Sequence, residues 1–453
     1  MKNNILSAVT LLAGAGAVTF CPMTEAEAFA AQTRGDIISV SDGASLSSTV
    51  LSAPPGSTIV LAAGNYPRLI IRRDVAGAPI RITGPREARV HQILFLRAEG
   101  WRVDGITLVG GIGKAMPADI AASRNIMLIN VKMTGATRDP GPRLEESNGI
   151  VIRDSEGIVL ALSEVTHVKQ IASLRDSFGV VIEGNQFTNA REGLMVRANH
   201  GLMIRHNIFV GWKPRFDIFE HPDMIQFMTQ AVPTGSSMVT IEGNYLSAGE
   251  DRAIQGIFVR AEAYEAGRSP MGYHRNFTIR NNVYHGSSRH GMTMSNVRGL
   301  KLVNNTLIGS PHAFVGNVPR DPGGRSSAGF QPAIVTSGIT WGRVQNNITP
   351  LIGIRPEAAG TREFNNFVYR PLTLSDASNP GYSFGAPLTG GDLPLKAFAI
   401  RARSANGIRG RGANVREVGP NAAKRDTVAL MIEALVLARN AKKQDLTVDP
   451  VQP

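Results

Sequence analysis

The chain has 453 residues, a net charge of +12 and a hydrophobic content of 43%. Its one cysteine excludes an internal disulfide and a cysteine-rich metal site. The positive charge favours an anionic partner. The repeats contain no long lysine–arginine run, and aromatic residues do not alternate with basic ones as a single-strand nucleic-acid binder would need. An acidic polysaccharide is therefore the expected partner, and nucleic acid is not.

Residues 1–30 predict a secretory signal peptide. Lys2 supplies the positive start, Ile5–Phe20 the apolar core, and small residues before position 31 the cleavage site. The apolar run is too short to favour the alternative, a membrane anchor. We expect a secreted or periplasmic protein without a transmembrane segment after cleavage, and Cys21 would leave with the leader.

An eleven-residue unit recurs along the chain. It reads RDSEGIVLALS, RDSFGVVIEGN, RANHGLMIRHN and SNVRGLKLVNN, at Arg153–Ser163, Arg175–Asn185, Arg197–Asn207 and Ser295–Asn305. The first three copies start 22 residues apart. Each copy holds short apolar runs with alternating polarity, broken by Gly, Asn, Asp and Ser, which indicates strand and turn without helix. A fixed period of this length predicts stacked units, here the coils of a parallel β-helix.

An asparagine closes most of these units, with Ser163 at one position. The expected column of stacked amides is Asn130, Asn185, Asn207, Asn244, Asn282, Asn305, Asn347 and Asn366. Stacked amides can satisfy the turn backbone and bond along the stack. Longer steps in the column predict insertions near 135–148, 211–222, 261–275 and 310–331, and insertions in solenoids collect on the binding face.

Three regions follow from this pattern: the leader 1–30, a β-helix of about ten coils at 31–370, and a C-terminal wrapping segment at 371–453. Residues 46–53 are expected to cap the first coil. Residues 421–443 have helical spacing. That helix is interpreted as a cap docked on the solenoid, with partner binding as the alternative.

The expected insertions bracket one strand that recurs in every coil. Stacking of that strand predicts two columns of side chains about 4.8 Å apart. The first column is Asn148, Gln170, Glu192, Asp223, Gln255 and His290, and the last is Arg153, Arg175, Arg197, Met228, Arg260 and Ser295. Stacked arginines either face solvent or bind a repeating anion, and Arg is suited to carboxylates by its bidentate geometry.

The opening TIVLAAGNY at Thr58–Tyr66, the asparagine column and HPDMIQF at His221–Phe227 carry a family resemblance. The chain resembles secreted right-handed parallel β-helix proteins of the pectate-lyase-like superfamily, which includes polyuronate lyases and mannuronan C5-epimerases. The resemblance implies an all-β, right-handed solenoid over roughly 36–370. The Asp-Pro-His triplet of the epimerases is absent, because His221-Pro222-Asp223 runs in the reverse order. No catalytic role is carried over from it.

The chemistry of a uronate lyase begins with loss of the C5 proton, after the carboxylate has been neutralised. Candidate roles follow from the densest polar cluster and its neighbours. Arg197 or Arg260 would neutralise the carboxylate. His221, Tyr273 or His274 would transfer the proton, and Asp223 would orient His221.

The remaining candidates bind rather than react. The substrate-binding residues are expected to be Arg153, Arg175, Arg197, Gln226, Gln255, Arg289 and His290. No cofactor is certain, although Glu192, Glu220 and Asp223 could hold Ca²⁺ through hard carboxylate oxygens. For hydrolysis, two carboxylic acids are needed, and Glu192 with Asp223 on adjacent coils could serve.

These observations predict an exported polysaccharide lyase that cleaves an acidic, uronate-containing polysaccharide by β-elimination. The alternatives are a non-catalytic glycan-binding or surface-attachment β-helix, a C5-epimerase and a glycoside hydrolase. Fold alone does not choose among them. The sequence does not fix the oligomeric state.

Overall fold

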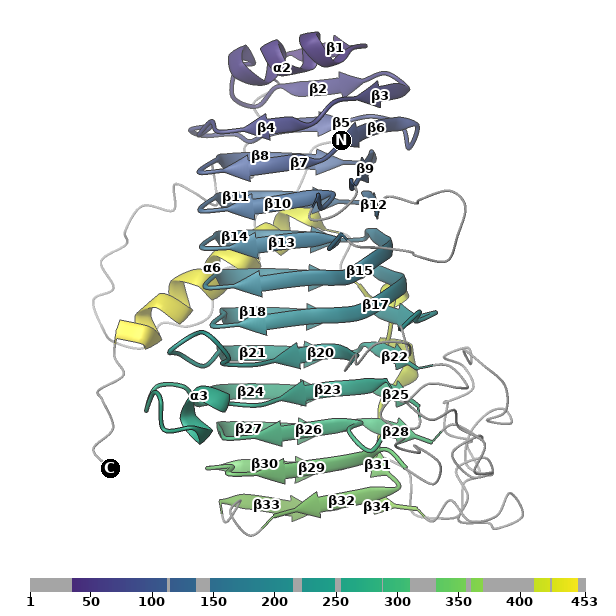
Figure 1. Ribbon diagram of the computed structural model, residues 1–453, viewed down its shortest axis with the longest axis vertical. Coiled ribbons are helices and arrows are strands. Elements are labelled where there is room, and N and C mark those ends of the chain that lie inside the picture. Colours follow the sequence, from purple (N-terminus) through teal and green to yellow (C-terminus); the bar gives the residue numbers. More distant parts are fainter. Residues whose placement is uncertain are drawn as a thin grey trace, which may run out of the picture.

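The computed structural model describes residues 35–111, 115–135, 147–214, 222–248, 254–286, 288–309, 331–355, 360–369, 411–423 and 426–446. Within them the chain winds into a parallel β-helix, with its coils stacked along the long axis (Figure 1). Neighbouring strands in each stack are parallel, as in the pairs β15–β17 and β24–β27. The predicted signal peptide lies outside the described residues. No helix in the described part is long and apolar enough to cross a membrane.

The strands form three stacks, here named faces A, B and C. Face A is a thirteen-stranded sheet, more than the roughly ten coils expected. Its strands are β1 (Ile37–Val40), β2 (Thr58–Leu61), β5 (Ile80–Thr83), β8 (Glu99–Asp104), β11 (Arg124–Ile129), β14 (Glu156–Ala161), β16 (Phe178–Glu183), β18 (His200–Arg205), β21 (Ser237–Glu242), β24 (His274–Arg280), β27 (Val297–Val303), β30 (Gly342–Gln345) and β33 (Thr361–Phe364).

The other two stacks are joined because two long strands run through both. These are β15 (Glu164–Arg175) and β17 (Gln186–Arg197). Face B adds β4 (Leu69–Ile71), β7 (Ile93–Leu96), β10 (Ala118–Ala121), β13 (Ile150–Arg153), β20 (Asp223–Phe227), β23 (Gln255–Val259), β26 (Met292–Ser295), β29 (Ala333–Ser337) and β32 (Leu351–Ile354). Face C adds β3 (Gly64–Tyr66), β6 (Ala88–His91), β9 (Thr107–Val109), β12 (Lys132–Thr134), β19 (Ile208–Val210), β22 (Tyr245–Ser247), β25 (Val283–His285), β28 (Thr306–Ile308), β31 (Ile348–Thr349) and β34 (Phe367–Val368).

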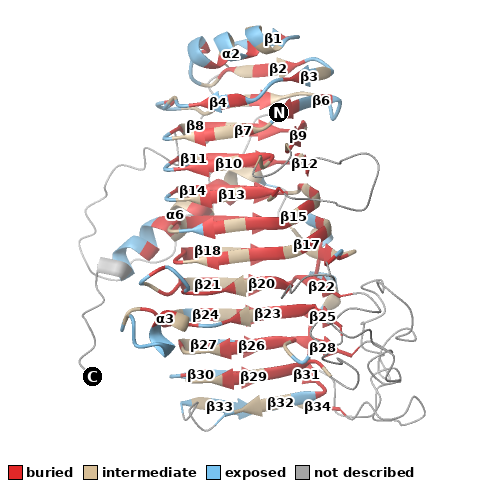
Figure 2. Ribbon diagram, in the orientation of Figure 1, coloured by how far each residue is buried: buried red, intermediate tan, exposed pale blue. Residues whose placement is uncertain are grey.

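Alternating apolar side chains from all three faces fill the interior as one continuous core. Buried positions recur along the strands of the stacked coils (Figure 2). The largest fully buried members of the core include Trp101, Phe95, Phe187, Phe227 and Phe277. A short helix, α2 (Gly43–Ser52), covers the first coil with Leu46 and Val50, as expected. Asp42 caps that helix by accepting a hydrogen bond from the Ser45 amide at 2.8 Å.

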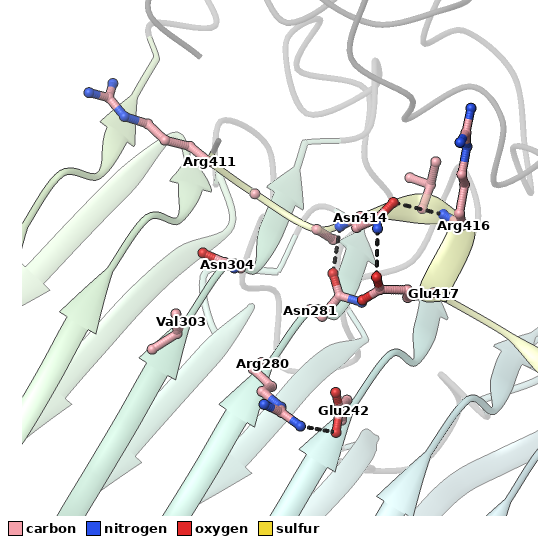
Figure 3. A pocket seen from close by; sticks show the side chains of 12 residues that line it. Glu242, Arg280, Asn281, Val303, Asn304, Arg411, Asn414, Arg416 and Glu417 are labelled. Atoms are coloured by element: carbon pink, nitrogen blue, oxygen red, sulfur yellow. Dashed lines mark hydrogen bonds and ion pairs between the residues drawn. The ribbon is translucent and has the colours of Figure 1, made fainter. Parts of the chain in front are cut away.

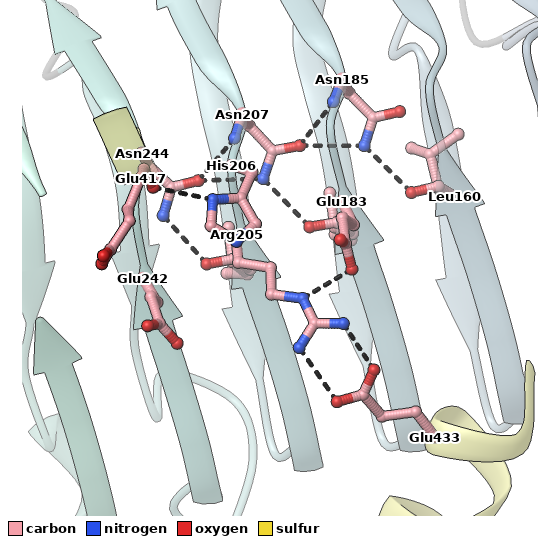
Figure 4. A network of polar contacts seen from close by, with 12 residues as sticks. Leu160, Glu183, Asn185, Arg205, His206, Asn207, Glu242, Asn244, Glu417 and Glu433 are labelled. Carbon is pink, nitrogen blue, oxygen red and sulfur yellow. Dashed lines mark hydrogen bonds and ion pairs between the residues drawn. The ribbon is translucent and has the colours of Figure 1, made fainter. Parts of the chain in front are cut away.

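The predicted asparagine column forms at the corner between faces A and C, from Asn185 to Asn366. Figure 4 shows its members Asn185, Asn207 and Asn244. Each amide oxygen accepts the backbone N–H of the preceding ladder residue, as Asn207 does for Asn185 at 2.9 Å. Asn130 is not a member, so that expectation is wrong. It has φ 49°, and it is the adjacent Val131 whose amide donates to the Ser163 hydroxyl in the next coil.

A second ladder, which the sequence analysis missed, lies at the corner between faces B and A. Ser123, Ser155, Ser177 and Ser236 accept backbone N–H donors from the coil before, at 3.1–3.2 Å. His274 continues this ladder, because its Nδ1 accepts the Ser236 amide at 3.0 Å. The signal was present in the repeat, where a small polar residue recurs two positions after each arginine.

The C-terminal helix α6 (Thr427–Leu446) runs across the outside of face A, over β11, β14, β16 and β18 (Figure 1). The docked-helix interpretation is therefore confirmed. The helix starts later than predicted because Asp426 caps it, accepting hydrogen bonds from the amides of Val428 and Ala429. Before it, residues 411–423 contain two 3₁₀ turns, η3 (Val415–Glu417) and η4 (Pro420–Ala422), and border a pocket of about 650 Å³ (Figure 3).

Candidate functional site

The strand register confirms both predicted columns on face B. Gln170 pairs with Glu192, and Asp223 pairs with Gln255 one coil further on. The pairing of β17 with β20 joins these two pairs. Arg153, Arg175 and Arg197 also form a vertical column. The polar column lies at the start of each strand and the arginine column at its end.

The polar column holds the most buried functional groups on this face. Gln170, Asp223 and Gln255 are 4–7% exposed, whereas Glu192 is only partly buried. Gln170, Glu192, Asp223 and Gln226 line a common hollow of about 10 Å³, which is room for about one water molecule. The described residues therefore bring two carboxylates and two amides together on three successive strands.

The arginine column is partly neutralised by nearby carboxylates. Arg153 pairs with Asp119 at 3.0 Å and Arg175 pairs with Asp176 at 2.7 Å. Arg260 pairs with Glu265, from the short helix α3 (Glu262–Glu265), at 2.8 Å, and this hydrogen bond raises the pKa of Arg260.

Arg197 differs from its neighbours in the column. Among the described residues it makes no ion pair, and its Nε is buried without a hydrogen-bond partner. Burial lowers its pKa, and the stacked Arg175 lowers it further. Glu262 offsets this only in part, so among the described arginines of the column Arg197 is the one whose charge lacks a paired carboxylate.

The structure argues against His274 as a catalytic residue. The ring is fully buried; Nδ1 accepts the Ser236 amide and Nε2 lies 3.0 Å from the Arg260 carbonyl. Burial lowers its pKa to about 4, so the ring is neutral at neutral pH. Its role is structural, since both nitrogens bind backbone groups of the turn.

Tyr273 is also unsuited to proton transfer on face B. It is 4% exposed, and the guanidinium of Arg298 lies 3.9 Å from its ring centre. Tyr264 of α3 packs edge-on against it. The ring therefore holds the insertion at 261–273 against the coils.

Other predicted residues are placed less centrally. His290 lies at the end of the polar column, where its Nδ1 contacts the Thr293 hydroxyl at 2.9 Å and its ring meets Phe258 edge-on. Arg289 is exposed beside it. His221 and Glu220 lie outside the described residues.

The calcium site stays a prediction, because Glu220 lies outside the described residues. They contain no group of three His, Cys, Asp or Glu side chains able to hold a metal ion. Glu192 and Asp223 alone fall short of the six to eight oxygens that Ca²⁺ prefers.

The outward column between the two predicted ones was missed. It contains Ser173, Met195, Gln226, Phe258 and Thr293, in register on successive strands. Only Gln226 was singled out from the sequence. Strand alternation could have found the others, since each lies two positions before the arginine column.

Residues 119–307 match the family model described as the right-handed β-helix region. No curated protein matches the chain. A pectate lyase from Bacillus sp. N165 in complex with trigalacturonate is 14% identical, with a TM-score of 0.39, and the match covers 56% of this chain and 83% of that one. The alginate lyase AlyGC is 14% identical with a TM-score of 0.38, covering 75% and 52%. PfbA, a surface adhesin of Streptococcus pneumoniae, is 10% identical with a TM-score of 0.40, covering 76% and 87%.

The chain thus has the right-handed parallel β-helix fold that the resemblance implied. The structural similarities are too low to carry a conclusion about activity. They include both lyases and an adhesin.

Proposed function

We propose that this right-handed β-helix is an exported polysaccharide lyase that binds an acidic, uronate-containing polysaccharide on face B and cleaves it by β-elimination. The observation that carries the proposal is Arg197. It is a half-buried guanidinium without an ion pair among the described residues, and it lies on the same strand as Glu192, which lines the hollow of carboxylates and amides. A uronate carboxylate would supply the missing counter-charge through a bidentate pair.

The distance between the columns supports separate roles for the arginine column and the polar column. Arg197 follows Glu192 by five positions on β17, which is about 16 Å along an extended strand. One sugar ring does not span that distance, so Arg197 would hold a carboxylate of a neighbouring sugar. The reacting sugar would lie at the polar column.

The polar column supplies the groups for the chemical step. In β-elimination a base takes the C5 proton, the C4–C5 double bond forms and the C4–O bond breaks, with the electron pair leaving on the glycosidic oxygen. Of the described residues, Glu192 and Asp223 are the carboxylates placed to accept a proton there. His221 remains a proposed partner in this transfer.

A glycoside hydrolase is the second candidate, because Glu192 and Asp223 lie on adjacent strands. Neighbouring strands lie about 4.8 Å apart, which resembles the short carboxylate separation of retaining glycosidases. If face B bound the polysaccharide without cleaving it, the protein would be a glycan-binding module.

One assay on a panel of polyuronates separates the three. A lyase raises both the number of reducing ends and the ultraviolet absorbance that comes from an unsaturated uronate. A hydrolase raises reducing ends alone, and a binding module raises neither while still retarding the polymer in gels. We expect both signals.

Two variants test the assigned residues. Replacing Arg197 with Gln should weaken substrate binding about ten- to hundredfold, the usual cost of losing a hydrogen bond to a charged group. The matched control is Arg175→Gln in the same column, which has Asp176 as its partner and should have little effect. Asp223→Asn should lower turnover by at least about 10²-fold if the carboxylate transfers the proton. Equal binding by both arginine variants would refute the anchor role of Arg197.

A further inference from the structure

The outward side chains in the central column of face A change character along the stack. Strand register places them in one line from β5 to β33. In order, they are Arg81, Arg102, Met127, Val159, Val181, Met203, Thr240, Thr278, Lys301, Arg343 and Arg362. The apolar run is the part that α6 covers. The last three positions are all cationic.

These last three residues, here named the basic ladder, are Lys301, Arg343 and Arg362. All three are exposed. Among the described residues none of them forms an ion pair, although Arg343 lies over the ring of Phe364 at 4.9 Å. Cations about 4.8 Å apart on neighbouring strands repel each other. Nothing in the described core requires this arrangement, so it points to an anionic ligand.

An exposed tryptophan stands beside the ladder. Trp341 lies two positions before Arg343 and is 76% exposed. It has φ 58°, whereas most corresponding turn positions in other coils are Gly or Asn, such as Gly179, Gly201 and Gly299. A bulky residue in this left-handed region is strained. An exposed indole kept in a strained turn is the second observation that points to a ligand.

We propose that the basic ladder and Trp341 form a second glycan-binding surface, which holds an acidic polysaccharide chain away from the site on face B. Cations repeating along a rigid sheet match carboxylates repeating along a polymer, and the indole offers a flat apolar platform for a sugar ring. The surface would anchor the polymer without cleaving it. This proposal goes beyond the lyase function and does not depend on it, because the two surfaces share no residue.

An anionic membrane is the less favoured ligand. Binding to lipid headgroups needs clustered basic residues together with apolar side chains that insert. Here the apolar groups beside the cations are one indole and the 40% exposed Phe364, which Arg343 already covers.

The chain offers a specific spectroscopic probe for this surface. It has three tryptophans, and Trp101 and Trp212 are buried whereas Trp341 is not. Collisional quenching by acrylamide, a neutral molecule, will therefore report mainly on Trp341. Saturating polygalacturonate or alginate should protect the fluorescence of the full chain from acrylamide, and an uncharged dextran should not.

The ladder itself is tested by a triple variant, Lys301→Gln, Arg343→Gln and Arg362→Gln. Affinity electrophoresis in polyuronate gels should show binding about tenfold weaker, since each exposed charge contact contributes little alone. Its matched control removes three exposed cations at the other end of the molecule, with Arg68→Gln, Arg72→Gln and Arg89→Gln. The control has the same net charge and should bind as the unaltered chain does. Both should retain the rates on short oligouronates, which occupy face B alone.

Three outcomes would overturn the proposal. The first is equal binding by the triple variant and its control, which would mean that only net charge matters. The second is polymer binding that leaves Trp341 as accessible to acrylamide as before. The third is protection of Trp341 by phosphatidylglycerol vesicles but not by polyuronates, which would make the surface a membrane contact. If no polyuronate is cleaved yet Trp341 is protected, the lyase function fails and this surface stands.

Discussion

At the scale of single residues, His274 shows how a position in the fold decides whether a side chain is available for proton transfer. His274 was a candidate for proton transfer from the sequence, because it ends an insertion beside the binding strand. In the structure it occupies a ladder position held elsewhere by serine or asparagine, and it binds backbone at both ring nitrogens. A polar residue in a loop and a polar residue in a turn ladder look the same in the local sequence. Only the stacking of coils in the structure shows which of the two a residue is.

This burial predicts a pH dependence. The pKa of His274 falls from 6.5 to about 4 in the folded chain, so between these values the unfolded chain binds a proton that the folded chain does not. Stability is therefore full above about pH 6.5 and is lost as the pH falls towards 4, by at most about 3 kcal/mol for this one group.

The test compares urea unfolding at pH 7.5 and pH 4.5 for the unaltered chain and for His274→Asn. The variant places an amide at a ladder position that Asn199 occupies in another coil, although the Asn199 Oδ1 accepts no hydrogen bond from the described residues there. It should lose stability at pH 7.5 but show a smaller difference between the two pH values. Comparing the pH differences of the two proteins cancels the contribution of the carboxylates, because these titrate in both. An unchanged pH difference would show that His274 is not the titrating group.

At the scale of elements, α6 is held on face A by packing and by a buried ion network (Figure 4). Arg205 donates to the fully buried Glu183 at 2.5 Å and to both oxygens of Glu433 on α6. Close approach matters too, because a side chain at Gly179 would lie 2.1 Å from the Ala434 carbonyl oxygen. The glycines of the repeat therefore leave the space in which α6 packs. The sequence indicated that they lie in turns, but it did not indicate this second role.

Substitutions at the two ends of this network should lower the unfolding free energy by different amounts. Arg205→Met removes the described cation from the buried Glu183 carboxylate and should cost about 3–5 kcal/mol of unfolding free energy. Glu433→Gln leaves the Arg205–Glu183 pair in place and should cost about 1 kcal/mol. Adding Glu183→Gln to Arg205→Met should recover much of the loss.

Thermal unfolding measures these costs, and hydrogen exchange of the α6 amides shows whether the helix detaches first. If Glu433→Gln proves as costly as Arg205→Met, the helix contact rather than the buried carboxylate dominates the network.

At the scale of the whole molecule, the sequence predicted the solenoid because its period is fixed by the geometry of one coil. The same period placed Gln170, Glu192 and Asp223 in one column, and it predicted the asparagine ladder except for Asn130. The period does not predict the contacts that side chains make on the outer surface of the coils. The contact between Arg205 and Glu433 of α6, for example, joins side chains that lie 228 positions apart in sequence.

The asparagine ladder yields a final prediction about how stability is distributed along the stack. Asn207 accepts the Asn185 amide through Oδ1, and its Nδ2 donates to the Ile182 carbonyl and to Asn244 at 3.0 Å. Asn207→Ala therefore strands a buried donor and a buried acceptor, at about 1–3 kcal/mol each. Asn366, on the last ladder position, is only partly buried, so water can replace its contacts in Asn366→Ala.

Because each coil contacts only its neighbours, the stability of a solenoid is close to a sum of local terms. Asn207→Ala should thus lower the unfolding free energy severalfold more than Asn366→Ala, as measured by urea unfolding followed by circular dichroism. Asn207→Ser should fall between them, since Ser163 shows that a hydroxyl can accept the same backbone donor. Equal losses at Asn207 and Asn366 would mean that the ladder amides contribute through the unfolded chain and not through their buried hydrogen bonds.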